Sequence, residues 1–382
     1  MNSRVAISVV LFLLLCSRII ASGQPSARDA NRVIEAFDIA KNGDFILLPV
    51  SIMGREYQFV LSTAAVRTVV DTRLRQTLGD PIGRRSDATI DGELEYAEYE
   101  PVPMKIGNGE FTAARELVCS DLAQIRAMTG HDIYGLVGLD YLRGRIIEID
   151  FDAGKFRVVA SVEPAEGSSS RILVRTENGH AATFSIPGLA RQPFVIDTAV
   201  TSPVSITALA VDALIESGLV TDIERMEYVA MTGKVFRQTG RLRSFTFNDW
   251  ELHDVRFMES ARESVGLGYL ARFRVTLDYQ KGVIYLSPGN RFSRLEPRDW
   301  SQMAIASLDG AVVVRRVIVG GVAERAAIKE GDALSKINGR TATEFSLFEI
   351  RELLSESHPV RLHVRRGTAV RIVELAPARP NK

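Results

Sequence analysis

The chain has 382 residues, of which 46% are hydrophobic and 25% are charged. Its 47 basic residues (Lys and Arg) equal its 47 acidic residues (Asp and Glu), so the formal net charge at pH 7 is zero. Without a basic stripe or a polybasic cluster, the composition argues against nucleic acid or an anionic membrane surface as partners. The length and the apolar content are sufficient for several packed cores.

The N-terminus has the pattern of an export signal. Arg4 precedes an apolar run over residues 6–16, and small residues follow at 21–23. This succession of charged, apolar and small residues predicts a signal peptide over residues 1–23. The apolar run is short for a membrane-spanning helix, although Arg18 near the cleavage site leaves an uncleaved anchor as the alternative. We expect an exported protein, periplasmic or secreted, that contacts a membrane only if this segment is not cleaved.

The cysteine count limits how the exported protein is stabilised. Cys16 lies within the predicted signal peptide, so Cys119 is the single cysteine of the mature chain. An internal disulfide is therefore impossible after cleavage, and we expect the stability to come from apolar cores.

Two segments of the chain share one pattern. Residues 57–65 read Tyr-Gln-Phe-Val-Leu-Ser-Thr-Ala-Ala, and residues 192–202 read Gln-Pro-Phe-Val-Ile-Asp-Thr-Ala-Val-Thr-Ser. Each is an apolar strand that ends at a small polar residue followed by Thr-Ala, which is how a strand presents a reactive side chain at the rim of a cavity. The polar residue is Ser62 in the first segment and Asp197 in the second. The alternative is that both segments are simply buried strand ends.

A second pair of segments follows in the same order. Residues 137–142 (Val-Gly-Leu-Asp-Tyr-Leu) precede a hairpin around Gly154, and residues 265–270 (Val-Gly-Leu-Gly-Tyr-Leu) precede a hairpin around Gly282. Glycine suits both a close approach of the backbone and a tight turn. The repeated order predicts duplication of a lobe of roughly 120 residues, since internal repeats take precedence over local assignments.

Turn signals divide the rest of this region. A polar linker over residues 163–170 separates a first lobe at 43–160 from a second lobe at 171–290. Most segments inside the lobes are short and alternate apolar with polar residues, so both lobes should be mainly β.

Smaller elements are predicted within the lobes. Turns at Asp91-Gly92 and Thr232-Gly233 lie between alternating apolar residues and indicate one hairpin in each lobe. Apolar residues at helical spacing predict a helix over residues 205–217 in the second lobe and a weaker counterpart over 71–78 in the first.

The last part of the chain has a different pattern. Residues 298–378 contain apolar strands, a turn at Gly331-Asp332 and a tight hairpin turn at Asn338-Gly339. Apolar residues over 345–354 recur at helical spacing and predict a helix with one apolar face. We expect a small α+β domain here.

Residues from about 43 to 290 resemble the aspartic peptidases, and most closely the bacterial retropepsin-like group. The match rests on residues 197–202, which read Asp-Thr-Ala-Val-Thr-Ser where the family has Asp-Thr-Gly-Ala-Thr-Ser, and on the Gly-Leu segments of the repeat. The resemblance implies two duplicated aspartic-peptidase-like β lobes, with Asp197 as the candidate catalytic residue and Ser62 at the degenerate partner position. The absence of a disulfide from the mature chain is more typical of bacterial members than of secreted eukaryotic ones.

The same resemblance implies a cleft that holds an extended peptide beneath two flap hairpins. Its candidate cleft and flap residues are Thr63, Thr198, Thr201, Ser202, Gly92 and Gly233.

The C-terminal domain at 298–378 resembles a PDZ domain of the bacterial type. The match rests on Glu330-Gly331-Asp332 and on Ile337-Asn338-Gly339, which follow a Gly-Gly pair at 320–321. The resemblance implies that a peptide is added as an extra strand and that a loop holds its terminal carboxylate. Residues 303–306 match that loop but contain no glycine. The candidate groove residues are Met303, Ala304, Ile305 and Phe348. The alternative is a module used only for docking or dimerisation.

Aspartic peptidase chemistry requires two carboxylates that share one proton, so that one acts as base and the other as acid. The hydroxyl of Ser62 cannot hold a charge near neutral pH. Without a charged neighbour, Asp197 is expected to titrate like an ordinary aspartate. Two chains that bring their Asp197 residues together remain an alternative, although the first lobe should already occupy the pairing surface of the second.

Other chemistries find little support in the sequence. The five histidines fall in no recognisable Ser-His motif. Spacings typical of zinc, calcium or phosphate sites are missing as well, so we expect no metal and no cofactor.

Three functions remain in view. The leading hypothesis is an exported protein that binds peptides or protein segments through a peptidase fold with a broken catalytic pair, with the PDZ domain as a docking module for a peptide or a protein partner. The first alternative is an active aspartic endopeptidase whose PDZ domain selects substrates. The second is a structural protein of the cell envelope.

Overall fold

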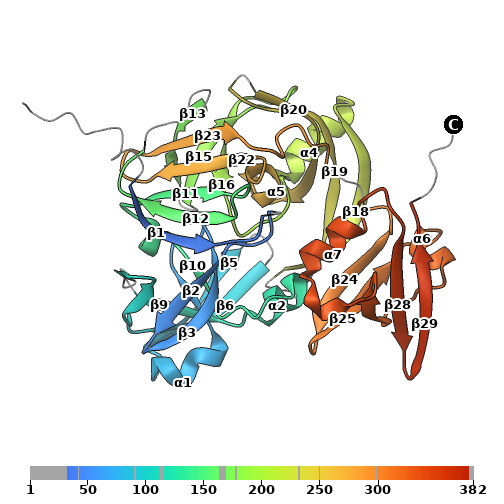
Figure 1. Cartoon of the computed structure of the whole chain (residues 1–382). Helices are drawn as coiled ribbons and strands as arrows, with labels where there is room; N and C mark the ends of the chain where they lie inside the picture. The colour runs from blue at the N-terminus through green and yellow to red at the C-terminus, as the bar shows by residue number, and fades with distance from the viewer. Residues whose placement is uncertain are drawn as a thin grey trace, which may run out of the picture.

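The computed structural model describes residues 32–41, 43–89, 92–111, 116–162, 169–176, 179–230, 233–248, 250–296 and 299–377. The predicted signal peptide, most of the predicted linker and the turn residues Asp91 and Thr232 lie outside the described residues. Within the described part of the chain, strands dominate and form four sheets (Figure 1), so the predicted mainly β class with a small α+β domain is confirmed.

Lobe 1 contains a nine-stranded sheet in the order β5-β6-β9-β4-β10-β3-β2-β7-β8. Its members are β2 (Leu47–Ile52), β3 (Arg55–Leu61), β4 (Val69–Asp71), β5 (Gly83–Thr89), β6 (Gly92–Tyr99), β7 (Met104–Ile106), β8 (Gly109–Phe111), β9 (Leu117–Ser120) and β10 (Gly135–Val137).

Lobe 2 contains an eight-stranded sheet in the order β14-β15-β16-β21-β17-β20-β19-β18. Its members are β14 (Val174–Thr176), β15 (Gly179–Phe184), β16 (Gln192–Ile196), β17 (Val204–Thr207), β18 (Val220–Ala230), β19 (Gly233–Phe247), β20 (Trp250–Ser260) and β21 (Ser264–Val265).

The two sheets share one topology. The order β2-β3-β10-β4-β9-β6-β5 in lobe 1 corresponds strand by strand to β15-β16-β21-β17-β20-β19-β18 in lobe 2. The directions agree too, because β10 is parallel to β3 and antiparallel to β4, as β21 is parallel to β16 and antiparallel to β17. The predicted duplication is therefore confirmed, and each predicted hairpin is formed by β5 with β6 and by β18 with β19.

A third sheet joins the lobes (Figure 1). Its order β1-β12-β11-β22-β23-β13 places the hairpin that follows each repeated Gly-Leu segment side by side, with β11 antiparallel to β22. Its members are β1 (Val33–Asp38), β11 (Ile146–Asp150), β12 (Lys155–Val159), β13 (Ser169–Ile172), β22 (Phe273–Asp278) and β23 (Val283–Pro288). The apolar core runs without a break through both lobes.

Short helices lie in the loops of the lobes. Two boundaries predicted from the sequence, one of a helix and one of the linker, differ from those of the structure. The predicted helix over 205–217 begins as strand β17, so the helix α4 covers only Ala208–Glu216, because β-branched residues around Ile206 suit the pleated sheet. Ser169 and Ser170, assigned to the linker, pair in β13 with β23. The other helices of the lobes are η1 (Thr72–Leu74), α1 (Arg75–Leu78), α2 (Ala123–Thr129), α3 (Leu139–Leu142) and α5 (Leu267–Leu270).

The C-terminal domain has its own sheet and its own apolar core. The strand order is β24-β25-β26-β28-β29, with β27 paired to β26, so that β24 lies at one edge. Asn338 and Gly339 both have positive φ in the turn between β26 and β27, as the hairpin motif predicts. The elements are β24 (Met303–Leu308), β25 (Ala311–Val317), α6 (Val322–Arg325), β26 (Ala333–Ile337), β27 (Arg340–Thr341), η2 (Ala342–Glu344), α7 (Leu347–Leu353), β28 (Val360–Arg366) and β29 (Ala369–Leu375).

Helix α2 of lobe 1 connects the lobes to the C-terminal domain (Figure 1), because it lies against β24, α7 and β18. A buried carboxylate fixes its start. Asp71 Oδ2 accepts from Leu122 N at 2.9 Å and from Arg126 Nη1 at 2.6 Å, and Asp71 Oδ1 accepts from Arg73 Nε at 2.8 Å. Burial opposes ionisation here, but these donors outweigh it and hold the pKa of Asp71 below its usual range.

We expect the substitution Asp71→Asn to lower the free energy of unfolding by about 3 kcal/mol at pH 7, since it leaves two arginines without their buried partner. A carboxyl with a lowered pKa stabilises the fold above its unfolded pKa of about 3.9 and loses that contribution as the pH falls through the folded value. The difference between wild type and variant should therefore shrink with acidification in urea titrations. Asp121→Asn is the matched control, because Asp121 also faces Arg126 but is exposed; an equal loss in both variants would contradict the assignment.

Candidate functional site

Ser62 and Asp197 occupy equivalent positions at the ends of β3 and β16, directly after each strand. Ser62 N donates to Val137 O at 2.9 Å, and Asp197 N donates to Val265 O at the same distance. Both residues are buried, with 4% and 5% of their surfaces exposed. The structure thus agrees with the sequence in placing both residues directly after a strand.

Two threonines join the lobes immediately after these residues. Thr63 N donates to Thr198 Oγ1 at 3.2 Å, and Thr198 N donates to Thr63 Oγ1 at 3.1 Å. Each hydroxyl also donates across the interface, from Thr63 to Ile196 O at 2.6 Å and from Thr198 to Leu61 O at 2.7 Å. This reciprocal network brings the loops that carry Ser62 and Asp197 together.

The glycine of each Gly-Leu segment packs closely against the loop that follows Ser62 or Asp197. A Cβ on Gly138 would lie 2.6 Å from the carbonyl carbon of Arg67, and a Cβ on Gly266 would lie 2.3 Å from the carbonyl oxygen of Ser202. Neither position leaves room for a side chain, which explains why both copies of the repeat have glycine there.

Asp197 has an ion-pair partner. Its Oδ1 accepts from Ala199 N at 3.0 Å, and its Oδ2 lies 3.2 Å from Arg262 Nη2. Burial raises the pKa of Asp197 above its ordinary value, against the opposing effects of Arg262 and of the Ala199 N–H. The expectation of ordinary titration was wrong, because the carboxyl is desolvated by the packed lobes and not merely deprived of a charged neighbour.

Ser62 repeats only part of this arrangement. Its Oγ accepts from Ala65 N, three residues further along, at 3.1 Å, whereas Oδ1 of Asp197 accepts from Ala199 N, two residues further along. A serine has no second oxygen to correspond to Oδ2. The hydroxyl of Ser62 can therefore accept a backbone hydrogen bond as a carboxylate oxygen does. It does not provide a second carboxylate oxygen that could exchange a proton in acid-base chemistry.

Arg262 is the residue that sequence reasoning missed. It lies four positions before Gly266, where the first repeat has Tyr134 before Gly138. Aligning the repeats beyond the apolar positions would have exposed this charge, but the alignment alone cannot tell that the guanidinium reaches Asp197.

A second asymmetry lies just after the glycines: Asp140 accepts from Thr68 N and Oγ1 at 2.9 and 2.5 Å, while lobe 2 has Gly268.

The remaining predicted cleft residues have other partners. Ser202 Oγ donates to Val204 O at 3.1 Å, and Thr201 O accepts from Gly268 N at 3.2 Å, so both stabilise their own loop. Gly92 and Gly233 begin the return strands of the two hairpins.

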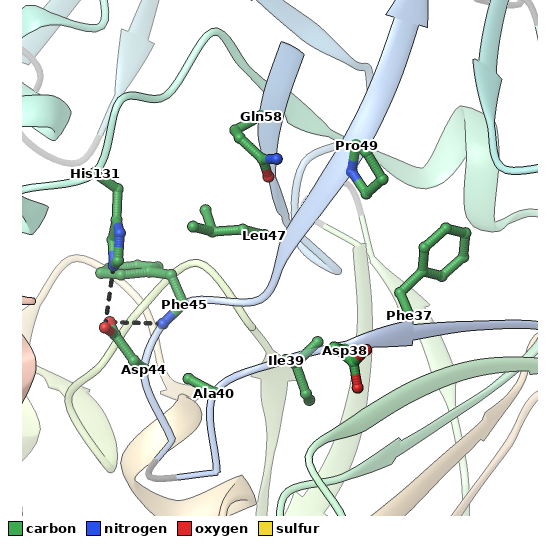
Figure 2. A pocket seen from close by; sticks show the side chains of 10 residues that line it. All are labelled: Phe37, Asp38, Ile39, Ala40, Asp44, Phe45, Leu47, Pro49, Gln58 and His131. Atoms are coloured by element: carbon green, nitrogen blue, oxygen red, sulfur yellow. Dashed lines mark hydrogen bonds and ion pairs between the residues drawn. The ribbon is translucent and has the colours of Figure 1, made fainter. Parts of the chain in front are cut away.

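One histidine lines a pocket in lobe 1. His131 Nε2 lies 3.0 Å from Asp44 Oδ2, beside a cavity of about 380 Å³ lined mainly by apolar side chains from the N-terminal strands (Figure 2). Ser62 is not among the residues that line it. The other oxygen of Asp44 accepts from Phe45 N at 2.8 Å, which holds the carboxylate in place (Figure 2). His131 therefore pairs with Asp44 at a cavity that Ser62 does not line.

The predicted groove residues of the C-terminal domain lie on two neighbouring elements. Met303, Ala304 and Ile305 belong to the edge strand β24, and Phe348 lies half-buried on α7. The assignment of residues 303–306 to a carboxylate-binding loop was wrong, since this stretch pairs with β25 as an edge strand, with a register shift between Ala304 and Ile305. Ile305 faces the core, while Ala304 is exposed, as alternation along a strand requires.

Among the described residues, no helix has the length and apolarity needed to cross a bilayer. No group of three or more His, Cys, Asp or Glu side chains in the same residues is arranged to hold a metal ion.

We expect Thr198→Val to lower the free energy of unfolding by about 3 kcal/mol, because it leaves Thr63 N and Leu61 O buried without a partner while preserving shape. Thr198→Ser keeps the hydroxyl and should cost less than about 1 kcal/mol. Guanidinium titrations of both variants make the comparison. A larger cost for Thr198→Ser than for Thr198→Val would mean that the methyl group, and not the hydrogen bonds, stabilises the interface between the lobes.

Comparison with known proteins gives a family for one part of the chain. The family model "PDZ domain" matches residues 295–365. A crystal structure of an aspartic proteinase from Irpex lacteus is similar to the chain with a TM-score of 0.43 and 12% sequence identity, over 68% of this chain and 98% of that one. A search of curated proteins returned no match. The C-terminal domain is thus a PDZ domain attached to two duplicated β lobes.

Proposed function

We propose that the protein is an exported, bacterial peptide-binding protein with a retropepsin-like fold and a broken catalytic pair. One observation carries the proposal: Asp197 pairs with the guanidinium of Arg262 at 3.2 Å, and the equivalent strand end of the other lobe has Ser62 instead of a second acid. A cation therefore occupies one oxygen of the single retained acid, and no second carboxylate is supplied by the equivalent strand end.

The chemistry of the site explains why binding is favoured over cleavage. Hydrolysis by an aspartic pair needs one carboxylate to take a proton from water while the other gives a proton to the leaving group. Ser62 cannot act as that acid near neutral pH, and its oxygen already accepts from Ala65 N. Arg262 is always protonated and supplies no exchangeable acid function. The site keeps polar groups that can contact a peptide backbone and lacks the pair that would cut it.

A second copy of the chain is poorly suited to complete the pair. The backbone N–H and hydroxyl of Thr198 already bond to Thr63 and to Leu61 O within the chain. A second Asp197 would have to displace lobe 1 and the continuous core that it shares with lobe 2. This favours a single-chain site with one acid.

Both kinds of module in the chain are suited to binding a peptide in an extended conformation. PDZ domains bind an extended peptide as an added strand at a sheet edge, and β24 is such an edge. The hairpins β5-β6 and β18-β19 are the candidate flaps of the cleft. The predicted signal peptide over residues 1–23 supports export to the periplasm or the medium.

The retained network around Asp197 keeps the active endopeptidase as a second candidate. The reciprocal threonine bonds would align two carboxylates if a second one were present, and the raised pKa of Asp197 is what a general acid would use. Under that candidate, the PDZ domain would select substrates.

The test is a cleavage assay of the mature chain, without residues 1–23, against a diverse pool of decapeptides from pH 3 to 7. We expect wild type to retain peptides without cutting them. The double variant Ser62→Asp/Arg262→Gln should cleave at least about a hundredfold faster than the wild-type background, since it restores a second acid and removes the cation.

Two controls make this result specific. Ser62→Asp alone should gain less than the double variant, because Arg262 still pairs with the acid. Adding Asp197→Asn to the double variant should abolish the gain. Wild-type cleavage that is lost in Asp197→Asn would refute the binding proposal and favour the endopeptidase, and a rate per molecule that rises with protein concentration would then point to a second chain.

A further inference from the structure

The edge strand β24 of the PDZ sheet has a backbone carbonyl that is already hydrogen-bonded to a side chain. Val314 N donates to Asp332 O at 2.8 Å, and Val314 O accepts from Gly331 N at 2.8 Å, so both backbone groups of Val314 point away from β24. Ile305 is its register partner on β24. In an antiparallel pair, Ile305 must then point its own backbone groups toward the open edge, where an added strand would pair with them.

A side chain of α7 occupies that edge. Arg351 Nη2 donates to Ile305 O at 3.3 Å and also to Met128 O, at the end of helix α2 of lobe 1, at 3.1 Å. One guanidinium thus joins the edge strand, the neighbouring PDZ helix and the lobe. An incoming peptide strand would have to compete with Arg351 for the same carbonyl.

The end of α2 is shaped to fit this surface. Gly130 ends the helix with φ of 76°, and a Cβ at Gly130 would lie 3.0 Å from Leu347 Cγ at the start of α7. Leu347 is 1% exposed. The glycine is therefore required twice, once by the left-handed turn and once by the close approach to the PDZ helix.

Both sides of this contact are held in place. The other end of α2 is fixed to lobe 1 through Asp71, which binds Leu122 N and Arg126. On the PDZ side, Arg291 from the end of lobe 2 donates to Glu352 of α7 at 2.5 Å. Helix α2 also lies against β18, a strand of the candidate flap in lobe 2. The contact thus links the PDZ edge to the candidate flap hairpin β18-β19.

We propose that helix α2 is an intramolecular blocker of the PDZ groove, which an extended peptide must displace and whose release loosens the β18-β19 hairpin. This inference rests on the proposed function, since it assumes that the PDZ edge takes peptides. Because only undocked molecules can bind, the apparent affinity for peptide equals the intrinsic affinity multiplied by the undocked fraction. Peptide engaged by the PDZ domain would therefore promote access to the cleft between the lobes.

The test compares Gly130→Asn with Gly144→Asn in the full mature chain. Both glycines have positive φ, 76° and 72°, which asparagine tolerates better than most residues, but nothing lies within 4 Å of a Cβ at Gly144. In hydrogen exchange followed by mass spectrometry, Gly130→Asn should exchange at least about tenfold faster in segments 123–130, 220–230 and 300–308, with β3 unchanged. Gly144→Asn should match wild type.

Peptide binding provides the second measurement. Immobilised Gly130→Asn and Arg351→Ala should each retain at least about ten times more of a biotinylated decapeptide pool with free C-termini than wild type does. Arg361→Ala is the matched control for the second variant, because Arg361 is an exposed arginine that pairs with Glu374 inside the PDZ domain.

The outcomes separate the inference from the function on which it rests. Unchanged exchange in Gly130→Asn, with equal peptide retention by all variants, would overturn the blocking role and leave peptide binding intact. Faster exchange without retention of peptide by any variant would overturn peptide docking by the PDZ domain, and the regulatory role with it. Faster exchange and greater retention together support both.

Discussion

The reciprocal hydrogen bonds between Thr63 and Thr198 are the constraint on which the site depends. Four buried polar groups at the interface of the lobes find their partners only across the pseudo-symmetric contact, and leaving any of them unpaired would cost the desolvation of that group. The two strand ends must therefore meet in one register. Residues 62 and 197 follow as neighbours, whatever side chains they have.

The two lobes share one backbone arrangement but differ in the charged residues of the site. Lobe 1 has Ser62 and Tyr134 at the positions where lobe 2 has Asp197 and Arg262. The fold tolerates the serine because its hydroxyl accepts the same kind of backbone N–H as Oδ1 does. Arg262 partly offsets the burial of the remaining carboxylate. Structural roles are thus preserved on both sides, while the paired acid function is not.

Helix α2 joins lobe 1 to the PDZ domain, because it lies against β24 and α7. Asp71 joins the helix start to the sheet of lobe 1, and the glycine at its end lets α7 approach closely. A short helix with one buried anchor and one small residue at its end thus lies against β24 and α7 of the PDZ domain and against β18 of lobe 2.

Local periodicity, turn chemistry and repetition predict the duplicated lobes, the hairpins, the strand-end positions of Ser62 and Asp197 and the PDZ domain. The predictions for residues 205–207 and 303–306 were wrong, because strand pairing prevailed there over helical spacing or loop analogy. The raised pKa of Asp197, its pairing with Arg262 and the bond from Arg351 to Met128 were decided only by the tertiary structure. These contacts join residues 65 and 223 positions apart, and a single sequence has no local signal for side chains that meet through packing.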